Sequence, residues 1–264
     1  MTDRDKKIYE RLDHDIKYVK NLGYEVFGVF LQGSQNYKLD YEGSDIDTKC
    51  IVVPTLEDIV LNEQPVSTTL ILEDNSHIDV KDIRLMWECF TKQNINFLEI
   101  LFTDYFYVPY KYGKYWFKML DMNEEIAHYD NYKAVNCIAG MVFEKNKALC
   151  HPYPTLKDKI EKYGYDNKQL HHIIRCEEFL KRYINGVPYS ECLIPTSPEY
   201  LVEVKSKYIY NLDEAKEIAK NIVEIAKDVK QKYMEQHERV INDEVKNKMD
   251  EILTDVIRAS LSED

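Results

Sequence analysis

Hydrophobic positions in the first part of the chain change from helical to strand-like spacing and back. A helical period predicts a helix over 5–22, carried by Ile8, Leu12, Ile16, Val19 and Leu22. Gly23 then supplies a residue suited to ending that helix. The near-continuous apolar run over 25–31 predicts a strand that is buried on both faces. A polar loop over 33–44 leads to a second predicted strand over 46–53, which Pro54 stops.

Further along, a short helical turn over 56–60 precedes two short strands, 67–72 and 77–80. The turn-forming residues 73–76 between these strands predict a hairpin. From residue 81 the apolar period becomes helical, and the clearest later helices are 134–149 and 166–184. Asn211 is expected to cap a long amphipathic helix, and a last apolar stripe over 249–257 predicts a final helix.

This order of elements predicts an α/β (α+β) chain. The expected architecture is a mixed sheet flanked by helices over 1–125, followed by an all-helical domain over 126–264. The boundary is a change of secondary-structure type without a low-complexity linker, so the two parts are expected to share an interface.

Charge narrows the range of partners. The chain has 264 residues and a formal net charge of -12, which argues against coating nucleic acid through a broad basic face. A local basic groove is still compatible with this charge, and the candidate lysines for it are Lys145, Lys147, Lys157 and Lys159.

The location of the protein is expected to be cytoplasmic. The first residues lack the apolar stretch of a signal peptide, and no apolar run approaches the ~18 residues that a membrane span needs. The six cysteines are widely spaced, without a Cys-x-x-Cys pair, and are interpreted as reduced, packed thiols rather than zinc ligands.

Two carboxylates, Asp45 and Asp47, stand at the start of the second predicted strand. One residue separates them, so they project from the same face if the segment is extended. Converging carboxylates without a basic partner repel each other, and a divalent cation with oxygen ligands relieves that repulsion. Mg²⁺ is the expected ion, with Mn²⁺ as a substitute.

Asp79 is the third candidate carboxylate, because the apolar residues on either side of it point to a core and leave it on the opposite face. Asp82 or Asp74 could take its place. If its strand lies beside that of Asp47, three carboxylates would hold two ions, and Asp79 would accept the proton of an attacking hydroxyl.

Gly33 and Ser34 end the first strand. Glycine lets the backbone approach a triphosphate closely, while the serine hydroxyl and the following N–H groups can donate to phosphate oxygens. Either fragment alone, Gly-Ser or Ser-Asp-x-Asp, is a common structural sequence; their order, spacing and strand context favour the catalytic interpretation.

The stretch 31–47 (LQGSQNYKLDYEGSDID) resembles the DNA polymerase beta-like nucleotidyltransferase superfamily. Its pattern is Gly-Ser, a spacer of about ten residues, Asp-hydrophobic-Asp, and a third carboxylate on a neighbouring strand. The stretch looks like the stand-alone bacterial and phage branch related to nucleotidyltransferases found beside RNA-repair ligases. The similarity continues through 77–101 and into 154–180. In that branch a Gly usually follows the Tyr, whereas this chain has Lys38, which puts the loop conformation in question.

The segment 163–175 (YGYDNKQLHHIIR) resembles a second signature of that branch. On a helix, Lys168, His172 and Arg175 lie on one face, and the resemblance implies that they bind the triphosphate or the departing pyrophosphate. The alternative is a solvated cationic face that pairs with Glu177 or Glu178. His171 could exchange roles with His172.

The function expected from this resemblance is metal-dependent transfer of NMP from an NTP, with ATP favoured, to an acceptor hydroxyl, releasing pyrophosphate. The favoured acceptor is an RNA 3′ end; a protein side chain or a small molecule are alternatives. A non-catalytic nucleotide-binding regulatory module is a second class of function. A helical adaptor is a third, which leaves the aspartates unexplained.

Overall fold

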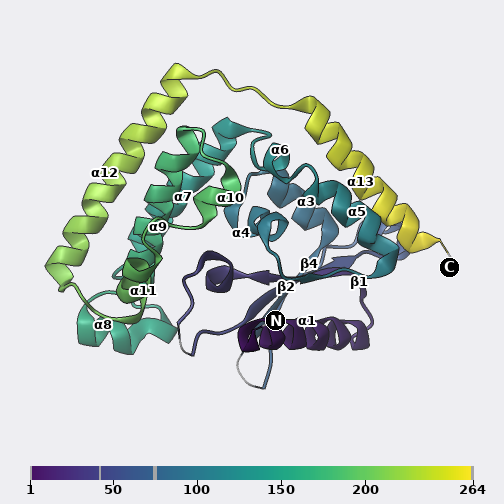
Figure 1. Cartoon of the computed structure of the whole chain (residues 1–264), viewed down its shortest axis with the longest axis horizontal. Helices are drawn as coiled ribbons and strands as arrows, with labels where there is room; N and C mark the ends of the chain where they lie inside the picture. The colour runs from purple at the N-terminus through teal and green to yellow at the C-terminus, as the bar shows by residue number, and fades with distance from the viewer. Residues whose placement is uncertain (1, 42, 74–75, 263–264) are drawn as a thin grey trace. The chain divides into compact units, whose positions relative to one another are not determined.

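The computed structural model describes residues 2–41, 43–73 and 76–262 (Figure 1). It confirms the predicted α/β class: a mixed five-stranded sheet with flanking helices comes first, and the region that follows is built of helices. Among the described residues, no helix is long and apolar enough to cross a membrane. The chain divides into two compact units, described separately below: unit 1 (1–36, 42–129 and 241–264) and unit 2 (37–41 and 130–240).

The sheet of unit 1 has the strand order β3-β4-β2-β1-β5. The strands are β1 (Glu25–Gln32), β2 (Asp47–Val53), β3 (Ser67–Ile71), β4 (His77–Asp82) and β5 (Phe106–Tyr107). The β2/β4 pair is parallel, and the other pairs are antiparallel. The predicted hairpin is therefore present as β3 and β4, although Asp74 and Asn75 of its turn lie outside the described residues.

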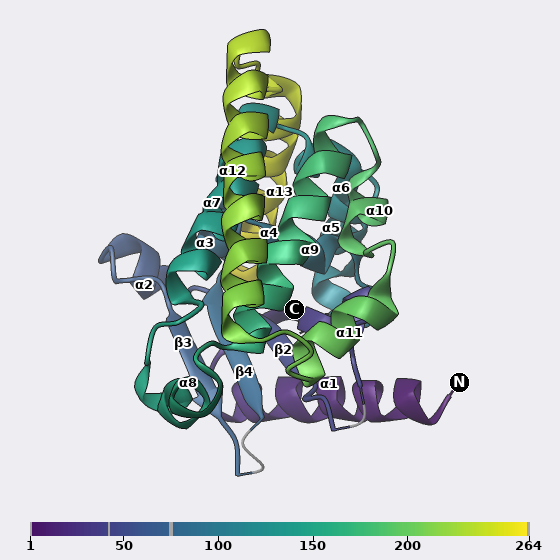
Figure 2. The same cartoon turned by 90° about the vertical axis from the view of Figure 1, so that its left-hand side faces the viewer.

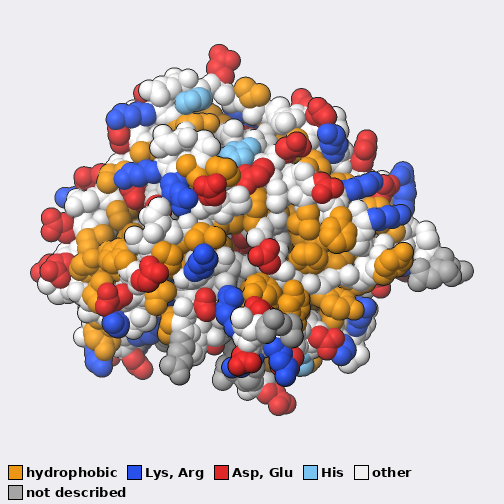
Figure 3. Space-filling model, viewed as in Figure 1, with side chains coloured by type: hydrophobic (Ala, Val, Ile, Leu, Met, Phe, Trp, Pro, Cys, Tyr) orange, Lys and Arg blue, Asp and Glu red, His pale blue; other side chains and the backbone are white. Residues whose placement is uncertain are grey.

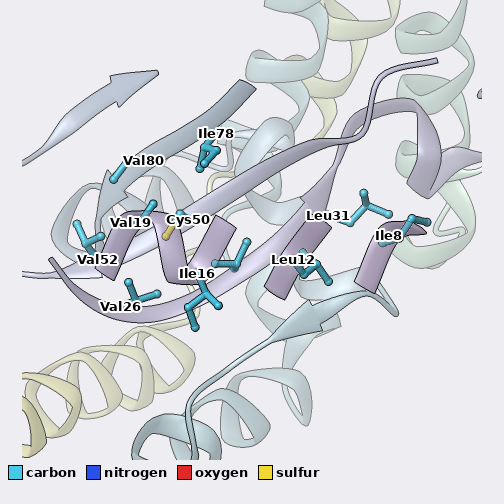
Figure 4. Close-up of a cluster of buried hydrophobic side chains, with 11 residues drawn as sticks. Ile8, Leu12, Ile16, Val19, Val26, Leu31, Cys50, Val52, Ile78 and Val80 are labelled. Carbon is cyan, nitrogen blue, oxygen red and sulfur yellow. The ribbon is translucent and has the colours of Figure 1, made fainter. Parts of the chain in front are cut away.

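One face of this sheet is covered by α1 (Asp3–Asn21), whose apolar stripe packs on β1, β2 and β4 (Figure 4). Fully buried residues of the cluster include Ile8, Leu12 and Val19 from the helix and Val29 and Leu31 from β1. A capping box fixes the start of α1, since the Thr2 hydroxyl and the Asp5 carboxylate each bind the other's backbone N–H. The spacing of apolar residues thus anchors the sheet to a helix as the sequence predicts.

The remaining helices of unit 1 follow the strands and end with the last helix of the chain. They are η1 (Gly33–Tyr37), which crosses into unit 2 at its last residue, α2 (Leu56–Val60), α3 (Ile83–Thr91), α4 (Ile95–Leu98), η2 (Glu99–Phe102), α5 (Tyr110–Leu120), α6 (Asn123–Ala127) and α13 (Asp243–Leu261). The helix α13 contacts α3, α5 and α6. The prediction placed all of 126–264 in the second domain, whereas α13 belongs to unit 1. The middle segment of unit 1 does end close to the predicted boundary, at Tyr129.

Unit 2 is built from helices around α7 (Asn131–Ala148), α9 (Asn167–Ile184) and α12 (Leu212–Gln236), which contact one another (Figure 2). Smaller elements complete it: η3 (Pro154–Leu156), α8 (Lys157–Tyr163), α10 (Tyr189–Leu193) and α11 (Pro198–Ser206). The Asn211 side chain caps α12 in a capping box with Glu214, as the sequence predicts for Asn211. The short segment 37–41, which follows η1, also belongs to this unit.

Candidate functional site

Gly33 and Asp47 are neighbours at the end of the β1/β2 pair. The antiparallel register places Gln32 opposite Asp47, and a Cβ added to Gly33 would lie 4.0 Å from Asp47 Oδ2. Gly33 also has φ +78, a backbone conformation that favours glycine, and it begins the short 3₁₀ helix η1 that contains the half-buried Ser34. The Gly-Ser turn and the second carboxylate of the motif therefore meet at one end of the strand pair.

The end of β1 is held in place by side chains next to the turn. Asn36 Nδ2 donates to Leu31 O at 2.8 Å, and the Thr103 hydroxyl donates to Asn36 Oδ1 at 2.7 Å. Arg4 Nη2 donates to Gln35 O at 2.7 Å. Three contacts outside the motif thus fix η1 on the sheet.

Asp45 and Asp47 have different backbone settings. Asp47 is the first residue of β2 and its side chain is 41% exposed, whereas Asp45 is exposed in the loop before the strand. The strand argument for a shared face therefore applies from Asp47 onward only. His77 on β4 lies beside Asp47, with Nδ1 3.9 Å from Asp47 Oδ1.

Asp79 lies on the strand next to Asp47, but its direct neighbour is a lysine. In the parallel β2/β4 register Asp79 is opposite Lys49, and Lys49 Nζ donates to Asp79 Oδ2 at 2.8 Å. Lys81 Nζ lies 3.2 Å from the other oxygen, Oδ1. Because side chains alternate along a strand, Asp47, Lys49 and Asp79 share one face of the sheet. Both oxygens of the third candidate carboxylate have a cationic partner.

Lys49 is a buried cation at this site. Its side chain is 3% exposed, and its ammonium lies 4.0 Å from the centre of the Phe97 ring. Burial lowers the pKa of Lys49, while the neighbouring Asp79 charge opposes that change. Sequence analysis did not single out Lys49, Lys81 or His77. For Lys49 the available signal was a lysine directly before the apolar run 50–53 and two residues after Asp47.

Asp82 and Asp74 were the alternatives to Asp79 as the third carboxylate. Asp82 caps α3: its Oδ1 accepts the Arg84 backbone N–H at 2.7 Å, and its carboxylate pairs with the Arg84 guanidinium. It is 1% exposed, so its two oxygens are committed to the helix start. Asp74 lies outside the described residues.

Two of the three carboxylates fit a divalent ion by their chemical type. Asp47 is partly exposed beside the Gly33 turn, Asp45 is exposed two residues before it, and carboxylate oxygens are ligands that Mg²⁺ prefers. Asp79 instead has an ammonium on each oxygen. Over 2–41, 43–73 and 76–262, no group of three or more His, Cys, Asp or Glu residues is arranged to hold a metal ion.

The cationic residues predicted on the second unit lie on α9. Lys168, His172 and Arg175 all belong to this helix, which Asp166 caps by accepting the Lys168 N–H at 3.2 Å. The acidic residues of the alternative interpretation pair with cations one turn further along the same helix, Glu177 with Lys181 and Glu178 with Arg182.

Arg175 has a contact that sequence analysis did not predict. Its guanidinium carbon lies 3.7 Å from the centre of the ring of Tyr37, the last residue of η1. Lys205 Nζ donates to Leu39 O at 3.4 Å, so two cations hold the segment 37–41 within unit 2. Arg175 thereby has a positioning contact with the residue three places after Ser34 in the chain.

The two adjacent histidines are both kept neutral. His171 is buried and donates Nδ1–H to Leu201 O at 2.9 Å; burial lowers its pKa to about 4. Burial, followed by the neighbouring His171 and Arg175, lowers the pKa of His172 well below its usual value. His171 is thus committed to the α9/α11 packing, whereas His172 is the partly exposed member of the pair.

Lys38 occupies a left-handed backbone position, with φ +59. Glycine adopts this conformation without steric cost, which gives a physical reason for glycine there in the branch that the motif resembles. In this chain the exposed Lys38 adopts that conformation itself.

In comparisons with known proteins, no family model and no curated sequence matches this chain.

Proposed function

We propose that this chain is a metal-dependent nucleotidyltransferase that transfers NMP from an NTP, ATP by preference, to an acceptor hydroxyl. The observation that carries the proposal is the position of Gly33 beside Asp47, with Asp45 just before the strand. A glycine turn that exposes backbone N–H groups next to two carboxylates can bind a triphosphate and its counter-ions together.

Each residue has a defined part in this proposal. Gly33 and Ser34 bind the phosphates, and Asp45 and Asp47 hold Mg²⁺ or Mn²⁺. The ions would supply positive charge to the phosphates as pyrophosphate leaves. Asp79 accepts the proton of the acceptor hydroxyl once it is released from a lysine, and Lys168, His172 and Arg175 are further phosphate ligands.

An RNA 3′ end is the acceptor that we favour. The face shown in Figure 3 has acidic and basic side chains interspersed, rather than a continuous basic surface. Such a surface suits a short end better than a long duplex, because affinity for duplex depends on many phosphate contacts. Protein side chains and small molecules are the alternative acceptors.

The test is incubation of the protein with α-labelled NTPs, Mg²⁺ and total RNA or lysate. Label transfer that is lost in Asp45→Ala and Asp47→Ala supports the proposal. Asp13→Asn is the matched control, since Asp13 is an exposed carboxylate of unit 1 that pairs with Lys17 on α1. Transfer that survives both aspartate substitutions would reject it.

A non-catalytic nucleotide-binding module is the second candidate. It is favoured by one observation: Asp79 is neutralised by Lys49 and Lys81, as a carboxylate without a metal would be. This candidate predicts that ATP binds, as measured by calorimetry, without transfer of label to RNA, protein or small molecules.

A further inference from the structure

We propose that Lys49 is a positioning residue that anchors Asp79 on β4, and that Lys81 is a second, releasable partner that keeps Asp79 neutralised in the free protein. The inference rests on the proposed function for its catalytic part only. Its metal-binding part is tested separately, so the two can fail independently.

Lys49 cannot move away from Asp79 at low cost. It enters the site from the interior of β2, is nearly fully buried, and has the Phe97 ring on its other side. An ammonium that leaves its carboxylate partner while remaining buried loses its compensation for desolvation. The Lys49–Asp79 pair therefore acts as a fixed unit across the two parallel strands.

Lys81 is held less firmly. It lies on the same strand as Asp79, its side chain is 19% exposed, and it also donates to the Ser67 hydroxyl at 2.7 Å. The Ser67 hydroxyl on the edge strand β3 already accepts from Lys81, so Lys81 keeps this partner when it leaves Asp79 Oδ1. One oxygen of Asp79 can thus be freed while Lys49 holds the other.

The consequence is a weakened affinity for divalent ions in the free protein. Two ammonium groups next to one carboxylate repel an incoming cation, and a unit charge a few ångströms away changes such an affinity by roughly tenfold. Removing the Lys81 charge should therefore tighten divalent binding, and only if Asp79 belongs to the same site.

The first experiment measures free Mn²⁺ by electron paramagnetic resonance during titration of the full chain, without nucleotide. We expect Lys81→Met to lower the Kd for Mn²⁺ about tenfold, and Lys81→Met in an Asp79→Asn background to give no such change. Lys81→Arg, which keeps the charge, should resemble the wild type. Lys17→Met controls for net charge, because Lys17 is an exposed lysine on α1.

An unchanged Kd in Lys81→Met, or an equal change in the Asp79→Asn background, would overturn the coupling between Lys81 and Asp79. Circular dichroism shows whether each variant is folded. This arm does not need turnover, so it decides the metal-binding part even if no NMP transfer is found.

The second experiment addresses the anchor. Lys49→Met leaves a partly buried carboxylate with one partner fewer and is liable to misfold, so Lys49→Arg is the informative variant. It keeps the charge but replaces a point cation by a larger planar group. We expect Mn²⁺ affinity close to wild type, a kcat at least about tenfold lower and an unchanged KM for the NTP. A wild-type kcat in folded Lys49→Arg would reject the positioning role.

Discussion

At the residue scale, His171 links protonation to stability. Its pKa in the folded protein is about 4, against an ordinary value of 6.5, because burial opposes the charged form. The unfolded chain therefore binds more protons between these two values. The contribution of neutral His171 to the free energy of unfolding is complete above pH 6.5 and is lost as the pH falls toward 4. His172 shifts in the same direction.

We predict that the free energy of unfolding depends less on pH in His171→Gln than in the wild type. Between pH 7 and pH 5.5 the wild type should lose about 1 kcal/mol more free energy of unfolding than the variant does. Urea denaturation followed by circular dichroism at the two pH values measures the difference. The exposed His237 provides the control, since His237→Gln should follow the wild type. Equal losses in wild type and His171→Gln would contradict this assignment.

The pattern of residues along the two strands predicts part of the site. Period-two alternation is enough to put Asp47 and Asp79 on polar positions of two strands. It does not fix the register between the strands, which makes Lys49 the partner of Asp79 and His77 the neighbour of Asp47. A lysine within an apolar strand predicts an exposed side chain. The burial of Lys49 becomes clear only from the structure, where its ammonium lies over the Phe97 ring.

At the element scale, most of the predicted helices and strands are confirmed. The helix predicted over 166–184 is α9, and the one predicted over 134–149 begins three residues earlier, at Asn131, as α7. The two-residue strand β5 was not predicted, because Phe106 and Tyr107 are too short a run to show a period of two. The last helix begins at Asp243, six residues before the predicted stripe, because Asn242 caps it.

Asp82 was an alternative to Asp79 as the third carboxylate, but it is the N-cap of α3. We predict that Asp82→Ala lowers the free energy of unfolding by about 1–2 kcal/mol, since the start of α3 loses its cap and Arg84 loses its partner. Chemical denaturation measures the loss. Asp82→Asn keeps an oxygen for the Arg84 N–H, so its free energy of unfolding should lie between those of the wild type and Asp82→Ala.

The same variants separate a cap from a metal ligand. Folded Asp82→Ala should bind Mn²⁺ as the wild type does, because both Asp82 oxygens are used at the helix start. A weaker Mn²⁺ affinity in folded Asp82→Ala, matched by Asp82→Asn, would instead place this carboxylate in the metal site.

At the scale of the whole molecule, the order of the chain and the composition of the compact units differ. The sequence indicates where sheet gives way to helix, because that change alters the apolar period. It does not indicate that the last helix joins unit 1, since an amphipathic stripe shows that a helix is covered on one side without showing by what. Tyr37 and its neighbours belong to unit 2 for a similar reason: their partners Arg175 and Lys205 are distant in sequence.

The contribution of α13 to unit 1 rests on a small set of buried side chains. They are Val245, Met249, Ile252 and Val256. In addition, Trp87 Nε1 of α3 donates to Asp250 Oδ1 at 2.9 Å. Burial of a side chain of this size stabilises by about 1.5–3 kcal/mol, so the four together amount to a large part of the about 5–15 kcal/mol that holds a domain folded.

We therefore predict that Met249→Ala destabilises unit 1 by about 2–5 kcal/mol. Both tryptophans of the chain, Trp87 and Trp116, lie in unit 1, so tryptophan fluorescence follows the unfolding of this unit alone. The urea midpoint of the fluorescence transition should fall in Met249→Ala and stay close to wild type in Leu261→Ala, whose side chain is exposed at the end of the same helix. If α13 instead folded as part of a separate helical domain, Met249→Ala would change the circular dichroism transition and leave the fluorescence midpoint in place.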